Sequence, residues 1–181
     1  MALKKTWYEI VAPEMFGSKV VGETLAVDAK QIVGRKISIS LLEFGRDFQK
    51  FYIKLNLKIQ KVEGGKAYAE FVGHEVIAER LYRMVQRRTR RVDCIQETTT
   101  KDGKKLRVKT IMILSRRVGT SIKHKARAKL KETVEAIVKE KSLEELIKMI
   151  IDDELQRQIW SECKKIYPVS AVEIRKTEVS A

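Results

Sequence analysis

Apolar and polar residues alternate along much of the chain up to residue 117, and this alternation predicts strands. Between residues 51 and 59 every second position is apolar, the period of two expected of a strand with one buried face. The segment 63–66, with Gly64 and Gly65 at its centre, supplies turn residues before the alternation resumes at Ala67. The pattern therefore predicts a β-hairpin here, and two further strands near residues 7–11 and 36–44.

A second hairpin is predicted between residues 92 and 114. The Asp102-Gly103 pair lies between two alternating segments and favours a type I′ turn, whose twist matches that of the flanking strands. The second strand carries Arg107 and Lys109 near its start and is apolar on both faces near its end. We therefore expect this strand to run from a charged surface into the core.

Apolar residues recur at helical spacing in segment 75–86 and again throughout 121–167, which predicts helices there. Within the longer segment, Ser142 and Glu145 have the spacing of a capping box, which marks the start of a helix. The last of these helices is expected to bury Trp160 and to end before Pro168. Residues 168–179 are then expected to form a final strand.

Strands followed by helices and one last strand predict the α+β class. We expect an antiparallel β-barrel-like core with helices packed at its side, and a C-terminal helical segment followed by a last strand. Residues 1–181 are predicted to form a single domain, in which 7–117 are mainly β with one helix, 121–167 are helical and 168–179 are the final strand. Hydrophobic residues make up 44% of the chain, which is normal for a globular protein and argues against a disordered basic tail.

No segment reaches the roughly 20 apolar residues that a membrane-spanning helix needs. No apolar segment follows Lys4 and Lys5, so a secretory signal is not expected. The two cysteines, Cys94 and Cys163, could form one disulfide, but their wide separation favours buried free thiols in a reducing compartment. The chain is therefore expected to be cytoplasmic.

The chain carries 38 Lys and Arg against 24 Asp and Glu, a formal net charge of +14, and the surplus is clustered. A compact domain with this surplus repels itself unless a polyanion neutralises it, and nucleic acid is the obvious polyanion. Two dense cationic runs, 87–91 and 115–127, flank the second predicted hairpin, which brings their ends together. A solvated charged surface is the alternative interpretation of such runs. The residues expected to bind RNA are Lys4, Lys5, Arg87, Arg88, Arg90, Arg91, Lys104, Lys105, Arg107, Arg116, Arg117, Lys123, His124, Lys125, Arg127 and Lys129.

The predicted helix that begins near residue 121 adds to this surface. Lys123, Arg127 and Lys131 are spaced so that they share one face of it. Cations are unfavourable at the positive end of a helix dipole, so a bound phosphate would explain their position there. Aromatic residues make up only 7% of the chain, and Trp7, beside Tyr8, is expected in the core rather than stacked on a base. The sequence therefore predicts binding to structured RNA through its phosphate backbone.

Residues suited to catalysis or metal binding are scarce. His74-Glu75 is similar to the start of a zinc-protease helix, but Ala78 stands where the second histidine would be needed. The chain has two histidines and no Cys-x-x-Cys pair, so no metal site, cofactor or catalytic residue is predicted, and His74 is expected in a loop or at a helix cap. The acids at 152–154 are expected to stabilise a helix start rather than to act as an acid–base pair.

Five blocks of sequence, in order along nearly the whole chain, are similar to one family. They are WYEIVAPEMFG (7–17), FVGHE (71–75), TTTKDG (98–103), KKIYP (164–168) and VEIRK (172–176). On these blocks the chain resembles the S-three-a family of archaeal and eukaryotic small-subunit ribosomal proteins, and its short length resembles the archaeal members. Relatives carry a longer Lys/Arg-rich arm ahead of the Trp-Tyr motif. Only Lys4 and Lys5 stand there in this sequence, so the resemblance does not support RNA contact by a longer arm here, and the predicted contact at this end is limited to these two lysines.

The resemblance implies a β-barrel-centred, non-catalytic ribosomal protein on the platform of the small subunit, near the messenger-RNA exit region. Its implied partners are small-subunit ribosomal RNA, neighbouring small-subunit ribosomal proteins and messenger RNA near the exit, with no membrane and no small-molecule substrate. The implied RNA contacts are the arginines at 87, 88, 90 and 91 and the segment 116–129, which the charge pattern also indicates. The alternatives are an RNA-processing enzyme, a non-ribosomal protein that binds structured RNA, and a peripheral protein held on acidic lipids.

Overall fold

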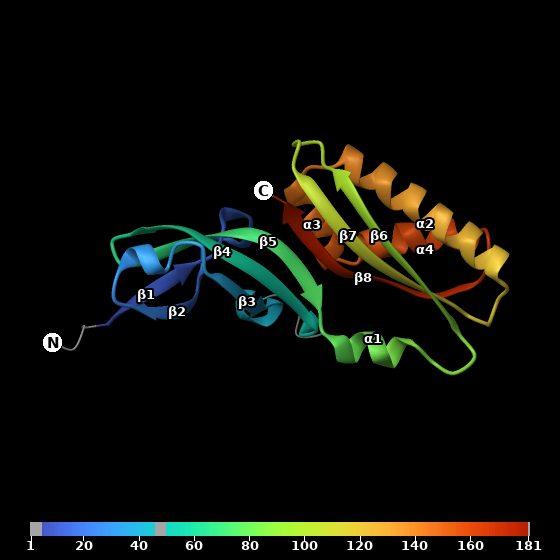
Figure 1. Cartoon of the computed structure of the whole chain (residues 1–181), viewed down its shortest axis with the longest axis horizontal. Coiled ribbons are helices and arrows are strands. Elements are labelled where there is room, and N and C mark those ends of the chain that lie inside the picture. Colours follow the sequence, from blue (N-terminus) through green and yellow to red (C-terminus); the bar gives the residue numbers. More distant parts are fainter. Residues whose placement is uncertain (1–4, 46–49, 181) are drawn as a thin grey trace. The chain divides into compact units, whose positions relative to one another are not determined.

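The structure, a computed structural model, describes residues 5–45 and 50–180 and divides into two compact units (Figure 1). Unit 1 is Met1–Glu75 and consists mainly of strands. Unit 2 is Val76–Ala181 and combines strands with all four α-helices that the described residues form. The α+β class predicted from the sequence is confirmed, with the C-terminal helices followed by a last strand. The single domain over residues 1–181 stays a prediction.

The strands of unit 1 form a sheet in the order β2-β1-β5-β4-β3. The hairpin predicted around residues 63–66 is confirmed, because β4 and β5 are joined by Gly64 and Gly65, whose φ angles of 56° and 82° suit a type I′ turn. The strands are β1 (Thr6–Val11), β2 (Val20–Ala26), β3 (Lys36–Ser40), β4 (Ile53–Glu63) and β5 (Lys66–Val76), with short 3-10 helices η1 (Glu14–Phe16), η2 (Ala29–Gln31) and η3 (Leu41–Phe44) between them.

The barrel-like core predicted from the sequence is wrong, because this sheet is not closed. Closing a barrel requires the two outermost strands to pair with each other. Among the described strands of unit 1, however, β2 pairs only with β1, and β3 pairs only with β4. The sheet is also mixed rather than antiparallel, since residues 9–11 of β1 pair in parallel with residues 66–68 of β5.

The core of unit 1 follows the alternation of its two long strands. The even spacing of Ile53, Leu55, Leu57 and Ile59 places all four side chains in the interior, where each is at most 1% exposed. Phe16 packs into the same unit with its ring centroid 5.1 Å from that of Phe44. This apolar layer stabilises the sheet of unit 1, because burial removes each of its side chains from water.

Two side chains of unit 1 depart from the predictions. Trp7 was expected in the core but is 66% exposed. The reason is that β5 pairs with β1 only from Glu9 onward, so the first residues of β1 have a single neighbouring strand, β2. His74 was expected in a loop or at a helix cap, but it is buried within β5, one residue before Glu75.

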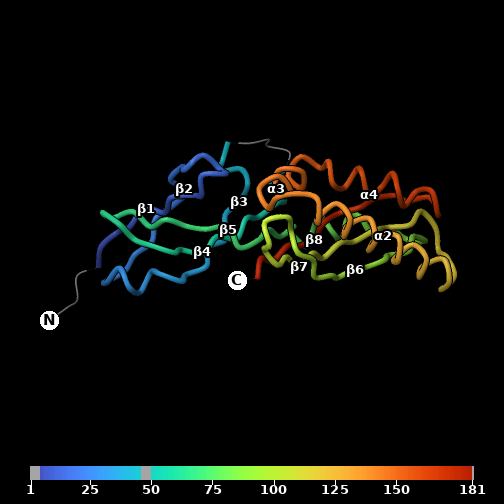
Figure 2. Tube along the Cα trace, turned by 90° about the horizontal axis from the view of Figure 1, so that it is seen from above, coloured from blue at the N-terminus to red at the C-terminus, as the bar shows by residue number. Residues whose placement is uncertain are grey.

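Unit 2 places helices against an antiparallel set of three strands, with β7 between β6 and β8. Helix α2 packs on β6, α4 packs on β8, and α2 lies beside α4 (Figure 2). The helix predicted over 75–86 is shorter than expected, because its first residues belong to β5. The elements are α1 (Ala78–Met84), β6 (Arg90–Thr99), β7 (Lys105–Leu114), α2 (Thr120–Glu140), α3 (Leu143–Ile151), α4 (Glu154–Lys164) and β8 (Val169–Ser180).

The β6–β7 hairpin and the capping box were both predicted, and both are present. The hairpin loop differs from the predicted type I′ turn, because Gly103 has φ 75° whereas Asp102 is not among the residues with positive φ. The hydrogen bond from the Gly103 N–H to the Thr100 carbonyl, 2.9 Å, instead fits a type I turn followed by a left-handed glycine. At the start of α3, Ser142 and Glu145 exchange both hydrogen bonds of the capping box.

The exposure of three side chains in unit 2 can be compared with the predictions. Cys94 and Cys163 are both buried free thiols, as expected. Trp160 is 36% exposed rather than buried, because its indole N–H reaches the Val169 carbonyl at 2.9 Å and holds the ring at the edge of α4. None of the described helices is long and apolar enough to cross a membrane.

Candidate nucleic-acid interface

The β6–β7 register brings the two cationic runs to the same end of unit 2. Arg90 pairs with Leu114 and Arg91 with Ile113, so the start of β6 lies beside the end of β7. Arg87 and Arg88 lie just before β6, and the second run follows Leu114 directly. The hairpin thus brings the two runs together as the sequence predicted, because arginines lie on both strands at its open end. Figure 1 shows this end, where β6 begins and β7 ends.

The first turn of α2 lies at this same end. At the opposite end, the hairpin loop binds the residues that follow α2: the Lys101 N–H donates to the Lys141 carbonyl at 3.1 Å, and Asp102 accepts from the Leu143 N–H at 2.8 Å. The 21 residues of α2 span about 31 Å, and the ten residues of each hairpin strand about 33 Å. A helix anchored at one end of the hairpin therefore begins near its other end, as Figure 1 shows.

We call this surface the cationic end of unit 2. The β8 strand also begins here, since the Ser115 N–H donates to the Pro168 carbonyl at 3.0 Å. The cationic end is defined by Arg87, Arg88, Arg90, Arg91, Arg116, Arg117, Lys123, His124, Lys125 and Arg127.

Most of the arginine charge at the cationic end is uncompensated. Arg91 pairs with Asp93 at 2.7 Å. The other five arginines of the two strand ends are exposed, and none of them forms an ion pair with a carboxylate in residues 5–45 or 50–180. Cationic side chains that repel one another and have no internal carboxylate partner are stabilised most by binding an external anion.

The backbone at the cationic end is held in an unusual conformation. Arg88 has φ 67°, the left-handed region that glycine usually occupies. It lies in a tight turn in which both the N–H and the hydroxyl of Thr89 donate to the Gln86 carbonyl, the hydroxyl at 2.7 Å. A non-glycine residue in this region costs roughly 1–2 kcal/mol. The turn therefore fixes the direction of two consecutive arginines at some expense in stability.

The start of α2 has the polarity that an anion would favour. Gly119 is its N-cap and offers no side-chain hydrogen bond, and its first turn contains no acidic residue. The unsatisfied N–H groups of a helix start carry partial positive charge. Here they lie next to Lys123 and Lys125, so backbone and side chains both attract negative charge.

Five predicted residues are elsewhere, and one lies outside the described residues. Lys104 and Lys105 occupy the opposite end of the hairpin, about 30 Å from the cationic end along strands of ten residues, and Arg107 lies about 23 Å from it along β7. Arg107 pairs there with Glu97 at 3.3 Å. Lys5 is exposed in unit 1, whereas Lys4 lies outside the described residues.

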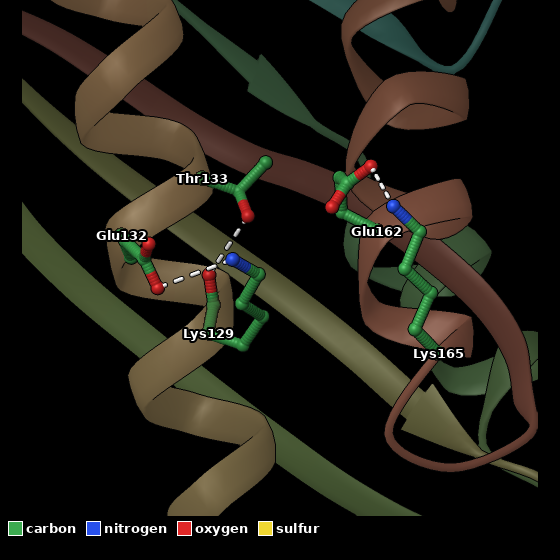
Figure 3. A network of polar contacts seen from close by, with 5 residues as sticks. All are labelled: Lys129, Glu132, Thr133, Glu162 and Lys165. Carbon is green, nitrogen blue, oxygen red and sulfur yellow. Dashed lines mark hydrogen bonds and ion pairs between the residues drawn. The ribbon is translucent and has the colours of Figure 1, made fainter.

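Lys129, the remaining predicted residue, lies further along α2 and faces α4. Its ammonium group is 3.2 Å from the Glu132 carboxylate, and its carbonyl accepts from the Thr133 hydroxyl at 2.9 Å (Figure 3). On α4, Lys165 pairs with Glu162 at 2.6 Å. A groove of about 430 Å³ runs between the two helices, and these pairs make its charge nearly balanced. Lys129 is therefore less available to an anion than the cations of the first two turns.

Comparison with known proteins identifies the family. A model of the ribosomal S3Ae family matches residues 2–181. The chain belongs to the ribosomal S3Ae family. Three relatives carry the name small ribosomal subunit protein eS1: those of Methanoculleus marisnigri (37% identical, covering 97% of this chain and 89% of the relative), Methanothermobacter thermautotrophicus (36%, 97% and 90%) and Archaeoglobus fulgidus (37%, 98% and 85%).

Membership of the S3Ae family confirms the resemblance seen in the five sequence blocks. It also agrees with the expectation that the chain is not an enzyme, because the family is one of ribosomal proteins. Within the described residues there is no group of three or more His, Cys, Asp or Glu side chains that could hold a metal ion.

Sequence reasoning missed some cations and one aromatic ring near the cationic end of this S3Ae protein. Lys164 and Lys165 precede Pro168, whose carbonyl is bound by the second cationic run, and the consecutive lysines were a signal for them. Arg83 and Tyr82 lie on α1, just before the first run, and both are exposed. The spacing of residues in α1 gave no signal for an exposed ring, because the sequence does not show whether a helical tyrosine lies on the buried face or on the exposed face.

Proposed function

We propose that the chain is a structural component of the small ribosomal subunit and binds small-subunit ribosomal RNA through the cationic end of unit 2. The observation that carries this proposal is the meeting of two distant cationic runs at one end of unit 2, where five arginines are exposed and form no ion pair with a carboxylate among the described residues. RNA phosphates would supply the missing negative charge, and each contact would release a condensed counterion. The names of the eS1 relatives support the ribosomal setting.

The mode of binding follows from the side chains available. Arg and Lys at strand ends and a helix start suit phosphate oxygens, which fix the position and orientation of an RNA but carry no sequence information. A-form RNA helices are recognised mostly by shape and backbone. The protein would thus read folded RNA by the spacing of its phosphates.

The resemblance extends this proposal to a location and to further partners. We place the protein on the platform of the small subunit near the messenger-RNA exit region, in contact with neighbouring ribosomal proteins and close to messenger RNA. The test of the assembly is sedimentation: the full chain should travel with small-subunit-sized particles at moderate salt. A protein that stays at the top of the gradient would contradict the proposal.

Salt dependence tests the electrostatic part. With six to ten phosphates contacted, raising the salt from about 50 to about 200 mM should lower RNA affinity about 10³- to 10⁵-fold. A triple variant, Arg87→Gln, Arg116→Gln and Arg117→Gln, should flatten the slope of log affinity against log salt by about 2–3, because each contact contributes about 0.7–0.9.

The matched control removes three exposed cations of unit 2 that lie away from the cationic end: Lys148→Gln, Arg157→Gln and Arg175→Gln. Both variants lose the same net charge, so only the position differs. Equal slopes for the two variants would mean that the protein attracts RNA by net charge alone and has no defined interface. A further variant, Lys104→Gln with Lys105→Gln, measures whether the bound RNA reaches the opposite end of the hairpin.

A further inference from the structure

An exposed aromatic ring stands next to the arginines of the cationic end. Tyr82 of α1 is 75% exposed, although tyrosine is usually at least partly buried. Its hydroxyl has no hydrogen-bond partner among the residues that the structure describes. Val85, which follows α1, is 40% exposed and extends this apolar surface. The ring is therefore held by the helix without contributing to the core.

The backbone keeps Tyr82 close to the first cationic run. The Val85 N–H donates to the Tyr82 carbonyl at 3.3 Å and closes the end of α1, and the tight turn at Gln86 follows at once. Arg87 is the fifth residue after Tyr82, so their Cα atoms are at most about 18 Å apart. A strand of RNA whose phosphates lie on Arg87 and Arg88 would therefore have neighbouring bases within reach of the ring.

The other exposed aromatic ring of unit 2 is already engaged. The indole N–H of Trp160 donates to the Val169 carbonyl at 2.9 Å, and the Lys164 ammonium lies 4.5 Å from its ring centroid. Tyr82 has neither kind of contact within the described residues. Of the two rings, that of Tyr82 is the more exposed, at 75% against 36%, and is the better placed to meet a ligand.

We propose that Tyr82 stacks on an unpaired base of the RNA that the cationic end binds, so that the interface selects folded RNA with a base free beside a helix. This inference rests on the proposed function. Unpaired bases stack on tyrosine rings and on guanidinium planes, and both kinds of group lie within residues 82–88. Because every base has a π-face, the selection is for an accessible base rather than for a particular sequence.

The test compares two RNA hairpins that differ only in one bulged nucleotide, with 2-aminopurine as the bulged base. Tyr82→Ala in the full chain should weaken binding to the bulged hairpin about 5- to 150-fold, the usual contribution of one stacked base, and should leave binding to the fully paired hairpin nearly unchanged. The wild type should quench the 2-aminopurine fluorescence, and Tyr82→Ala should not. Tyr82→Phe should behave as the wild type, because the ring is retained.

The outcomes separate this inference from the proposed function. Equal weakening on both hairpins, no weakening on either, or full rescue by Tyr82→Leu would overturn the stacking of Tyr82. The salt slope should be the same for Tyr82→Ala and the wild type, since no charge is lost. If the wild type binds both hairpins without salt dependence, the proposed function itself fails. Strong salt-dependent binding with no effect of Tyr82→Ala would refute the stacking alone.

Discussion

Glu173 is a carboxylic acid in the interior of unit 2, and its titration should be visible in the stability of the fold. It lies in β8 opposite Ile111 and is 4% exposed. Burial, and after it the charge of Asp153, raise the pKa of its carboxyl from an ordinary value of 4.5 to about 7. Arg80 and a hydrogen bond from Gln156 oppose this shift only in part. Between pH 5 and 7 a large share of the folded molecules, still about half of them at pH 7, therefore holds a proton that the unfolded chain has released.

The sign of the pH dependence follows from this difference. Between pH 4.5 and about 7 the folded state binds more protons than the unfolded state, so stability falls as pH rises through this window. Above it the loss is complete, and the gap between the two pKa values corresponds to about 3 kcal/mol. The variant Glu173→Gln, which keeps the shape without the charge, should therefore raise the free energy of unfolding by up to about 3 kcal/mol at pH 8. At pH 5 it should have little effect.

The measurement is urea unfolding of the full chain from pH 5 to 8. Unfolding is monitored by the fluorescence of Trp160 in a Trp7→Phe background, so that the signal comes from unit 2 alone. Glu178→Gln is the control, because Glu178 lies in the same strand but pairs with Lys109 and Lys176 at 3.2 and 3.1 Å. Removing the charge of Glu178 should lower the free energy of unfolding only slightly, by no more than about 1 kcal/mol. If Glu173→Gln has the same effect at every pH, or destabilises throughout, the reasoning from burial is refuted.

Two further predictions concern local backbone features of unit 2. Ser142→Ala should lower the free energy of unfolding by about 1 kcal/mol because it removes the capping box with Glu145, and Ser161→Ala, at an exposed position inside α4, should change it far less in the same urea titration. Arg88→Gly should be more stable than Arg88→Ala by about 1 kcal/mol, the reverse of the usual order, because only glycine adopts φ 67° without strain. Both Arg88 variants should lose RNA affinity equally, and an Ala variant as stable as the Gly variant would show that the turn is unstrained.

The parts of the fold that were predictable depend on residues close together in sequence. The hairpin at Gly64-Gly65, the hairpin at Gly103 and the capping box at Ser142 each rest on a few neighbouring side chains, and all three are present. The order of strands depends instead on pairings between distant segments. The parallel contact of β1 with β5, and the outer edges of β2 and β3 that pair with no other described strand, leave no mark on the alternation, so the barrel was predicted wrongly.

The same distinction applies to the cationic surface. The meeting of Arg90 with the end of β7 was predictable, because a hairpin must join its two flanks. Lys104 and Lys105 were grouped with the arginines because they are near in sequence, whereas extended strands carry them about 30 Å away. The exposure of Tyr82 was not predictable, because the choice between core and surface depends on which face of α1 meets the rest of unit 2.

Two hydrogen bonds join the hairpin loop to the corner between α2 and α3. Because they fix the C-terminal end of α2, the length of α2 sets where its first turn lies and which way its side chains point. Lys101 and Asp102 hold this corner, so the number of residues in α2 determines the distance from the corner to the first turn of the helix. One residue inserted midway along it would advance the first turn by about 1.5 Å and rotate it by about 100°. Lys123 and Arg127 would then project in another direction with their charges intact. Evolution of this surface is therefore constrained in insertions and deletions as much as in the identity of its lysines and arginines.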